Sequence, residues 1–136
     1  ALPHPVSLEL ETEKASAAER PLVILFSLQG CPYCEVVRRN YLITMHAAGG
    51  HVVQLEMRKQ LAVIGFLGET TTHEALGRAL KIKVAPTVVF AGAKGVELAP
   101  RISGVPLLDF YGAYLDERIA YATAQLRGNR GRSNLT

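Results

Sequence analysis

The chain of 136 residues contains two cysteines, Cys31 and Cys34, separated only by Pro32 and Tyr33. A disulfide stabilises a fold mainly by closing a long loop of the unfolded chain, and a bridge between these two residues would close almost none. A zinc site needs about four ligands, whereas the histidines are widely scattered, at His4, His46, His51 and His73. The cysteine pair therefore favours thiol–disulfide chemistry over a structural cross-link or a metal site.

The two cysteines lie where a predicted strand gives way to a predicted helix. Residues 22–26 form a continuous apolar run, which is typical of a central strand covered on both faces. Pro32 suits the first turn of a helix, where backbone N–H groups lack partners and leave a partial positive charge. We expect this environment to lower the pKa of the Cys31 thiol and to make Cys31 the nucleophile. Cys34, one turn further along, would be the resolving thiol that attacks Cys31.

The rest of the pattern predicts strands and helices that alternate along most of the chain. Apolar alternation and short apolar runs indicate strands, and helical spacing between capping and stop signals indicates helices. We expect strands at residues 6–10, 22–26, 51–57, 86–90 and 96–103, a helical turn within 11–20, and helices from 32 to the glycines at 49 and 50, from 71 to 81 and from 107 to 126. Residues 59–70 are assigned to neither class. This order predicts an α/β fold with a mixed sheet.

The segment Ala85-Pro86-Thr87 precedes the apolar strand at residues 86–90, and proline is tolerated at the first position of a strand. With the dithiol, the turn at residues 92–95 and Gly104, it resembles the thioredoxin-like superfamily over about residues 20–127. The resemblance implies a thioredoxin fold, in which helices flank a central mixed β-sheet. It also implies a cis Ala85–Pro86 bond beside the dithiol and a substrate groove that includes Pro32, Tyr33, Ala85, Pro86 and Gly104. An ordinary strand-entry proline and a turn glycine are the alternative interpretation.

Several positions depart from the thioredoxin pattern. Gly30 stands where thioredoxins have tryptophan, Leu25 stands at the position of their buried aspartate, and Arg39 replaces a helix proline. The Cys-Pro-Tyr-Cys sequence resembles glutaredoxins. Together with Gly30 it also resembles exported thioredoxin-like proteins, including those of bacterial sulfur-oxidation systems. We interpret Arg38 and Arg39 as solvated residues of the helix surface.

The excess positive charge lies at the C-terminal end of the chain. The formal net charge is +3, and residues 1–126 carry equal numbers of acidic and basic residues. The excess is confined to Arg127, Arg130 and Arg132. The resemblance implies a thioredoxin-like domain at residues 21–127, preceded by an N-terminal extension with a short strand at 1–20. The composition of residues 128–136 predicts a flexible basic tail. A stripe of basic and aromatic residues typical of nucleic-acid binding is absent from the sequence, and so is an apolar run of the roughly 18 residues needed to span a membrane.

These features predict a thiol–disulfide oxidoreductase that needs no cofactor. Its expected partner is a client protein with a disulfide or a reactive cysteine, which it reduces or isomerises, with electrons supplied by a membrane thiol donor. Glutathione is a further candidate partner. We expect an exported, periplasmic protein from which a signal peptide has been removed, with the cytoplasm as the alternative. Alternative functions are a disulfide-forming oxidase, a glutathione-linked glutaredoxin-like enzyme, and a non-enzymatic thiol or metal-binding module.

Deleting residues 128–136 should leave dithiol turnover unchanged, because this tail, which includes Arg130 and Arg132, lies outside the predicted domain and its dithiol. Rates of protein-disulfide reduction by the full and truncated chains, compared at equal folded concentration, measure this. A loss of more than half the activity would contradict the division of the chain.

Overall fold

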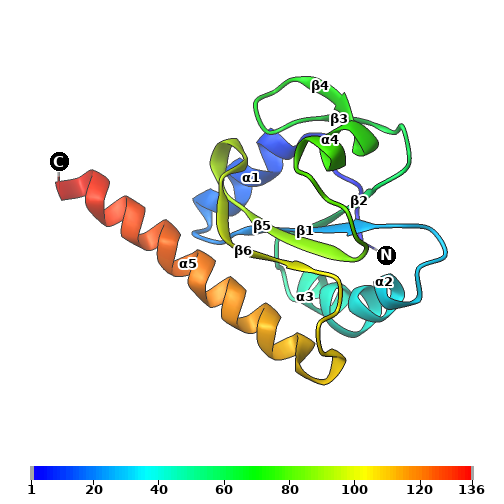
Figure 1. The fold of residues 1–136 in the computed structure, drawn as a ribbon. Helices are drawn as coiled ribbons and strands as arrows, with labels where there is room; N and C mark the ends of the chain where they lie inside the picture. The colour runs from blue at the N-terminus through cyan, green and yellow to red at the C-terminus, as the bar shows by residue number, and fades with distance from the viewer. Residues whose placement is uncertain (1, 136) are drawn as a thin grey trace.

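The fold is built around a mixed four-stranded sheet (Figure 1). The computed structural model describes residues 2–135, with only the backbone of residues 129–135. The strands follow the order β2-β1-β5-β6, with β1 at Leu22–Ser27, β2 at Val52–Glu56, β5 at Thr87–Ala91 and β6 at Glu97–Ser103. β1 pairs parallel with β2 and antiparallel with β5, and β5 pairs antiparallel with β6. The predicted α/β fold with a central mixed sheet is confirmed.

Helices cover both faces of this sheet. On one face lie α2 (Pro32–Val37), the π-helical segment η1 (Arg38–Leu42), α3 (Ile43–Ala47) and α5 (Tyr111–Leu135). On the other face lie α1 (Leu8–Ala17) and α4 (His73–Ala79). α2, η1 and α3 follow one another directly, which confirms the helix expected after the dithiol. None of the helices in the described part of the chain is long and apolar enough to cross a membrane.

The central strand β1 contributes to two hydrophobic clusters, one on each face of the sheet. Every residue of β1 is buried. Because side chains alternate along a strand, Val23 and Leu25 pack toward α2 and α5, whereas the other cluster receives Leu22, Ile24 and Phe26. A continuous apolar run is what such a doubly covered strand requires.

The predicted strand at residues 6–10 is wrong. Ser7 forms only an isolated bridge to Ile64, and α1 begins at Leu8. Ser7 caps this helix, because its Oγ accepts a hydrogen bond from the Leu10 N–H at 3.1 Å. The buried side chains of α1 are Leu8, Thr12 and Ala15, a helical spacing that a five-residue window cannot reveal.

Other boundaries also differ from the sequence prediction. The unassigned region contains β3 (Ala62–Ile64), which pairs antiparallel with β4 (Thr70–Thr72) in a second, two-stranded sheet. Single turns of 3₁₀ helix, η2 (Ala93–Gly95) and η3 (Leu108–Phe110), precede β6 and α5. The backbone of α5 continues to Leu135, beyond the predicted end at residue 126. The flexibility predicted for residues 128–136 stays a prediction, since the side chains of 129–136 lie outside the described residues.

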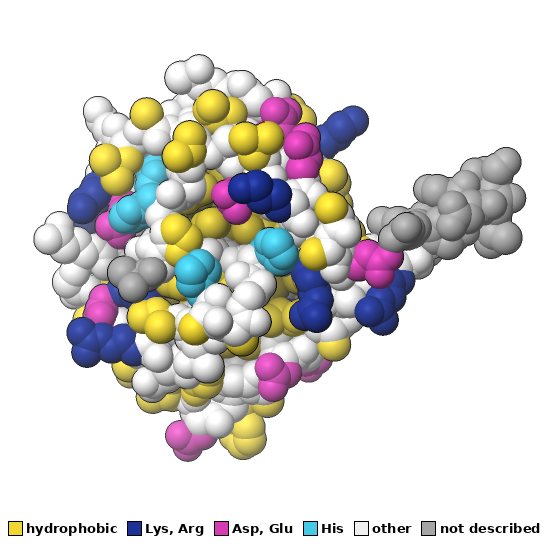
Figure 2. All heavy atoms as spheres, turned by 180° about the vertical axis from the view of Figure 1, so that it is seen from behind, with side chains coloured by type: hydrophobic (Ala, Val, Ile, Leu, Met, Phe, Trp, Pro, Cys, Tyr) yellow, Lys and Arg dark blue, Asp and Glu magenta, His cyan; other side chains and the backbone are white. Residues whose placement is uncertain are grey.

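Charged side chains of both signs are interspersed on the face shown in Figure 2. Local ion pairs include Lys59 with Glu56 at 3.6 Å and Arg78 with Glu74 at 3.7 Å. That face therefore presents no broad field of one sign, in agreement with the balanced charge of residues 1–126.

The residue that caps the N-terminus of α4 can be tested by substitution. The Ser/Thr-x-x-Glu spacing of Thr71 and Glu74 is typical of a capping box with Thr71 as the cap. In the structure the Oγ1 of Thr72 instead accepts a hydrogen bond from the Ala75 N–H at 3.1 Å. Thr72→Ala should lower the free energy of unfolding by about 1 kcal/mol, because that N–H loses its partner. Thr72→Ser keeps the acceptor and should stay near the native value. Denaturant unfolding of both, with Thr71→Ala as the matched control, measures the effect. Equal losses for Thr71→Ala and Thr72→Ala would contradict this assignment.

Candidate active site

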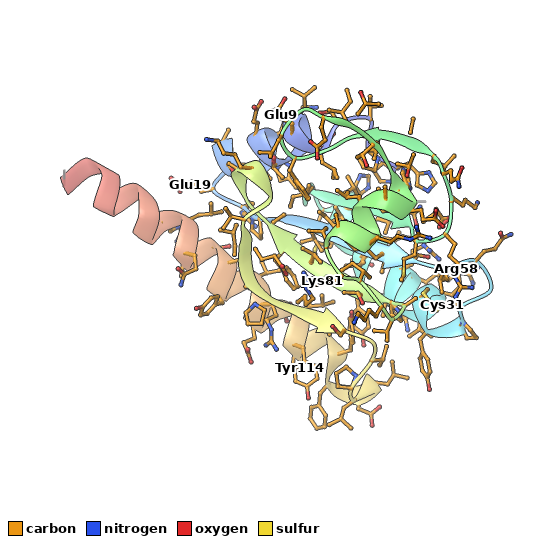
Figure 3. All side chains as sticks on the ribbon, turned by 45° about the horizontal axis from the view of Figure 1, so that its top comes forward. Glu9, Glu19, Cys31, Arg58, Lys81 and Tyr114 are labelled. Carbon is orange, nitrogen blue, oxygen red and sulfur yellow. A yellow bond between two sulfur atoms is a disulfide. The ribbon has the colours of Figure 1, made fainter. Side chains whose placement is uncertain are left out.

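Cys31 and Cys34 form a disulfide at the start of α2, where Figure 3 labels Cys31. Their Cα atoms are 5.2 Å apart. Cys31 is the N-cap residue, and its Sγ accepts a hydrogen bond from the Cys34 N–H at 3.2 Å. Pro32 occupies the first helical turn, as the sequence predicts. The sulfur of Cys31 thus contacts one of the backbone N–H groups that the helix leaves without an internal partner.

The two cysteines differ in exposure. Cys34 is completely buried, whereas Cys31 is partly exposed. Pro32 and Tyr33 between them are exposed, with more than half of the Tyr33 surface open to solvent. A molecule approaching from solvent therefore reaches the sulfur of Cys31 before that of Cys34.

Strand register brings the dithiol, the proline segment and Gly104 to one end of the sheet. Phe26 near the end of β1 pairs with Thr87 at the start of β5, and Thr87 pairs with Ser103 at the end of β6. Pro86 precedes Thr87 and Gly104 follows Ser103, so the segments adjoin. The Gly104 N–H donates a 2.7 Å hydrogen bond to the Pro86 carbonyl.

The Ala85–Pro86 peptide bond is cis, as the resemblance implies. Pro86 is buried and Ala85 is partly exposed. The Thr87 hydroxyl donates a 2.7 Å hydrogen bond to the Val84 carbonyl and holds the segment in a tight turn. Gly104 has φ +69°, a backbone conformation that favours glycine, and a Cβ added there would point into open space.

Exposed apolar side chains lie on the three segments at this end of the sheet, and of these only Tyr33 was predicted from the sequence. We call this set the apolar rim. It comprises Tyr33, Val84, Leu107, Leu108 and Phe110. Each belongs to the dithiol, proline or post-Gly104 segment and is more than 40% exposed. The available signal was the three large apolar residues at 107, 108 and 110, which the helical interpretation assigned to packing.

Arg38 is not a solvated surface residue, which corrects the sequence interpretation. Its side chain is only 14% exposed, compared with 75% for Arg39. The guanidinium donates hydrogen bonds to Ser27 Oγ at 2.7 Å and to Gln54 Oε1 at 3.0 Å, and it forms an ion pair with Glu35. Sequence reasoning could not find these partners, because Ser27 and Gln54 lie on separate strands.

Leu25 is fully buried at the position where thioredoxins carry an aspartate. The buried polar side chains on that face of β1 and β2 are Ser27 and Gln54, both uncharged. The guanidinium of Arg38 donates hydrogen bonds to both. Glu56, the register partner of Ser27 at the end of β2, has a side chain that is only 15% exposed.

Structural comparison gives the same fold in several solved oxidoreductases. DsbH oxidoreductase shares 17% identity, with a TM-score of 0.58 over 91% of this chain and 86% of that one. A thioredoxin from Thermus thermophilus shares 18%, with a TM-score of 0.56 over 86% and 87%. Thioredoxin f2 from Chlamydomonas reinhardtii shares 18%, with a TM-score of 0.54 over 83% and 94%. A search of curated proteins found no match.

The fold and the Cys-x-x-Cys disulfide define a thioredoxin-fold thiol–disulfide oxidoreductase. The family model described as Thioredoxin-like domain matches residues 8–117. The chain belongs to this family.

Proposed function

We propose that the protein exchanges disulfides with client proteins, with Cys31 as the nucleophile and Cys34 as the resolving thiol. The observation that carries this assignment is the difference in exposure, since Cys31 is open to solvent and Cys34 is fully buried. The contact between Cys31 Sγ and the Cys34 N–H supports it, because the same N–H can stabilise a thiolate.

The exchange transfers two electrons from the dithiol to the client. The Cys31 thiolate attacks one sulfur of the client disulfide, the client S–S bond breaks, and a client thiolate leaves and takes up a proton. Cys34 then loses its proton and attacks the Cys31 sulfur, which releases the second client thiolate. The protein ends as the Cys31–Cys34 disulfide and the client as a dithiol.

Client binding is assigned to the surface between the three adjoining segments. The backbone of Ala85 would pair with an extended client segment as an added strand, and Gly104 would leave room for it. The added Cβ at Gly104 would meet nothing within 4 Å, so that position is open to a ligand. Pro32, Tyr33 and Pro86, with the apolar rim, favour a client whose cysteine has apolar neighbours.

We assign the protein a reducing or isomerising role after export to a compartment such as the periplasm. A membrane thiol donor or glutathione would be the electron source. Support for export is the resemblance of the segment at residues 30–34 to exported thioredoxin-like proteins. Fractionation of cells that express the natural gene tests the compartment directly.

Cys34→Ser should trap client proteins as mixed disulfides, because the resolving attack is lost while Cys31 remains. Non-reducing electrophoresis of cell extracts should show adducts that disappear on reduction. Cys31→Ser is the matched control and should yield far fewer adducts. Absence of adducts with Cys34→Ser, or equal trapping by both variants, would contradict the assigned roles.

Direction of electron flow should appear in the reduction potential of the dithiol. For a reductase we expect a midpoint below about −250 mV, and for an isomerase one near about −180 mV, on the scale of characterised thiol–disulfide couples. Titration of the Cys31–Cys34 pair in glutathione buffers measures it. A midpoint near about −120 mV would contradict the reducing role and favour the oxidase.

A further inference from the structure

Arg38 lies on the same side of the active-site helix as Cys34. The two residues are separated by four positions, a spacing that places side chains one turn apart on one helix face. Cys34 and Val37 on this face are fully buried, and the Arg38 side chain is mostly buried. Exposed neighbours such as Tyr33 and Arg39 lie on the opposite side. The guanidinium of Arg38 therefore lies on the same helix face as Cys34, whose sulfur must resolve the mixed disulfide.

Hydrogen bonds to the sheet fix the position of the Arg38 guanidinium. Ser27 Oγ on β1 and Gln54 Oε1 on β2 accept two of its hydrogen bonds. Gln54 is itself fixed, because its Nε2 donates a 2.7 Å bond to the Leu2 carbonyl. The planar guanidinium matches several acceptors at once, which a flexible ammonium does less well.

The carboxylate that pairs with Arg38 lies on the solvent side of its guanidinium. Both inner acceptors are uncharged, and Glu35 lies toward solvent with half of its side chain exposed. Glu35 also pairs with Arg39 at 3.3 Å, so one carboxylate faces two guanidinium groups. Glu56 is the register partner of Ser27, is only 15% exposed and pairs with Lys59 at 3.6 Å. Arg58 lies with these residues around one surface hollow.

The helix changes form at the same residue. α2 ends at Val37, and the π-helical segment η1 begins with Arg38. Such widened turns occur frequently at functional sites. The Arg38 N–H still donates to the carbonyls of Cys34 and Glu35, which ties the arginine backbone directly to the resolving cysteine.

We propose that Arg38 is a positioning residue that activates Cys34 by stabilising its thiolate during the resolving step. This inference rests on the proposed function, because it assumes that Cys34 attacks Cys31. A positive charge close to a thiol favours the thiolate, and the attraction is stronger beneath the surface than in water. Leu25 has no polar group that could assist Cys34, and the positive charge of Arg38 would provide this assistance instead. The proton released by Cys34 passes to water or to the departing thiolate.

The two attacks can be observed separately with a chromogenic aromatic disulfide as the probe. Reduced protein releases one coloured aromatic thiolate when Cys31 attacks and a second when Cys34 resolves the mixed disulfide. Stopped-flow absorbance at a series of pH values gives both rates. Arg38→Gln should slow the second phase about tenfold at neutral pH and shift its pH midpoint upward by about one unit. The first phase should change by less than threefold.

Matched variants separate charge from packing. Arg38→Lys keeps the charge and should restore the second phase to within about threefold of the native rate. Arg39→Gln removes an exposed cation that contacts the same Glu35 and should leave both phases unchanged. Thermal unfolding of each variant shows whether the fold is retained. The inference is overturned if Arg38→Gln leaves the second phase unaltered, or if Arg38→Lys is as slow as Arg38→Gln. It is also overturned if Arg39→Gln slows the second phase equally.

The native protein and Cys34→Ser distinguish this failure from failure of the proposed function. Native protein should show two phases and Cys34→Ser only the first. If Cys34→Ser also releases the second thiolate, the resolving role of Cys34 is wrong whatever the Arg38 variants do. If these two behave as expected and Arg38→Gln has no effect, only the role of Arg38 is wrong.

Discussion

The antiparallel pairing of β5 with β1 and β6 is the constraint on which the reactive end of the protein depends. It sets Phe26, Thr87 and Ser103 side by side, so that three segments distant in sequence open at one end of the sheet. Residues of β5 are buried throughout, and burial of each large apolar side chain contributes roughly 1.5–3 kcal/mol. The core therefore holds the dithiol, the cis-proline segment and Gly104 together, with one hydrogen bond between Gly104 and Pro86 completing the arrangement.

The helix that follows β1 divides the two sulfurs between solvent and core. Cys31 stands before the first turn, where its sulfur meets a backbone N–H, and Cys34 lies inside the first turn against the sheet. Because β1 ends at Ser27 and the helix begins at Pro32, only a short loop separates the dithiol from a strand that is buried along its whole length. The different exposure of the two cysteine side chains thus arises from their positions along one helix.

Residues whose type reports a backbone requirement could be predicted from sequence. Pro32 at a helix start, Pro86 before a strand and Gly104 at positive φ each reflect a local constraint that few other residues satisfy. The strand predicted at residues 6–10 was wrong because alternation over five residues also fits the first turns of a helix. The short strands β3 and β4 depend on pairing with each other, which no local pattern encodes.

Arg38 could not be recognised from sequence for a related reason. A charged residue two turns into a helix is usually exposed, and its acceptors come from two strands that the helix happens to cover. The residues Leu107, Leu108 and Phe110 of the apolar rim were also missed, because they fit a helical pattern as well as an exposed loop. Only the end of β6 and the turn η3 place them at the open end of the sheet.

A guanidinium and a carboxylate near a dithiol have opposite effects on the resolving thiolate. A carboxylate can accept the proton of the resolving thiol, but its negative charge disfavours the thiolate that results. A guanidinium favours the thiolate and remains protonated throughout. Stabilising a thiolate also stabilises the reduced protein, which shifts the couple toward oxidising potentials. With Leu25 and Arg38 in this layer, a faster resolving step would come with a less reducing potential of the dithiol. A reducing role would therefore depend on the donor that keeps Cys31 and Cys34 reduced.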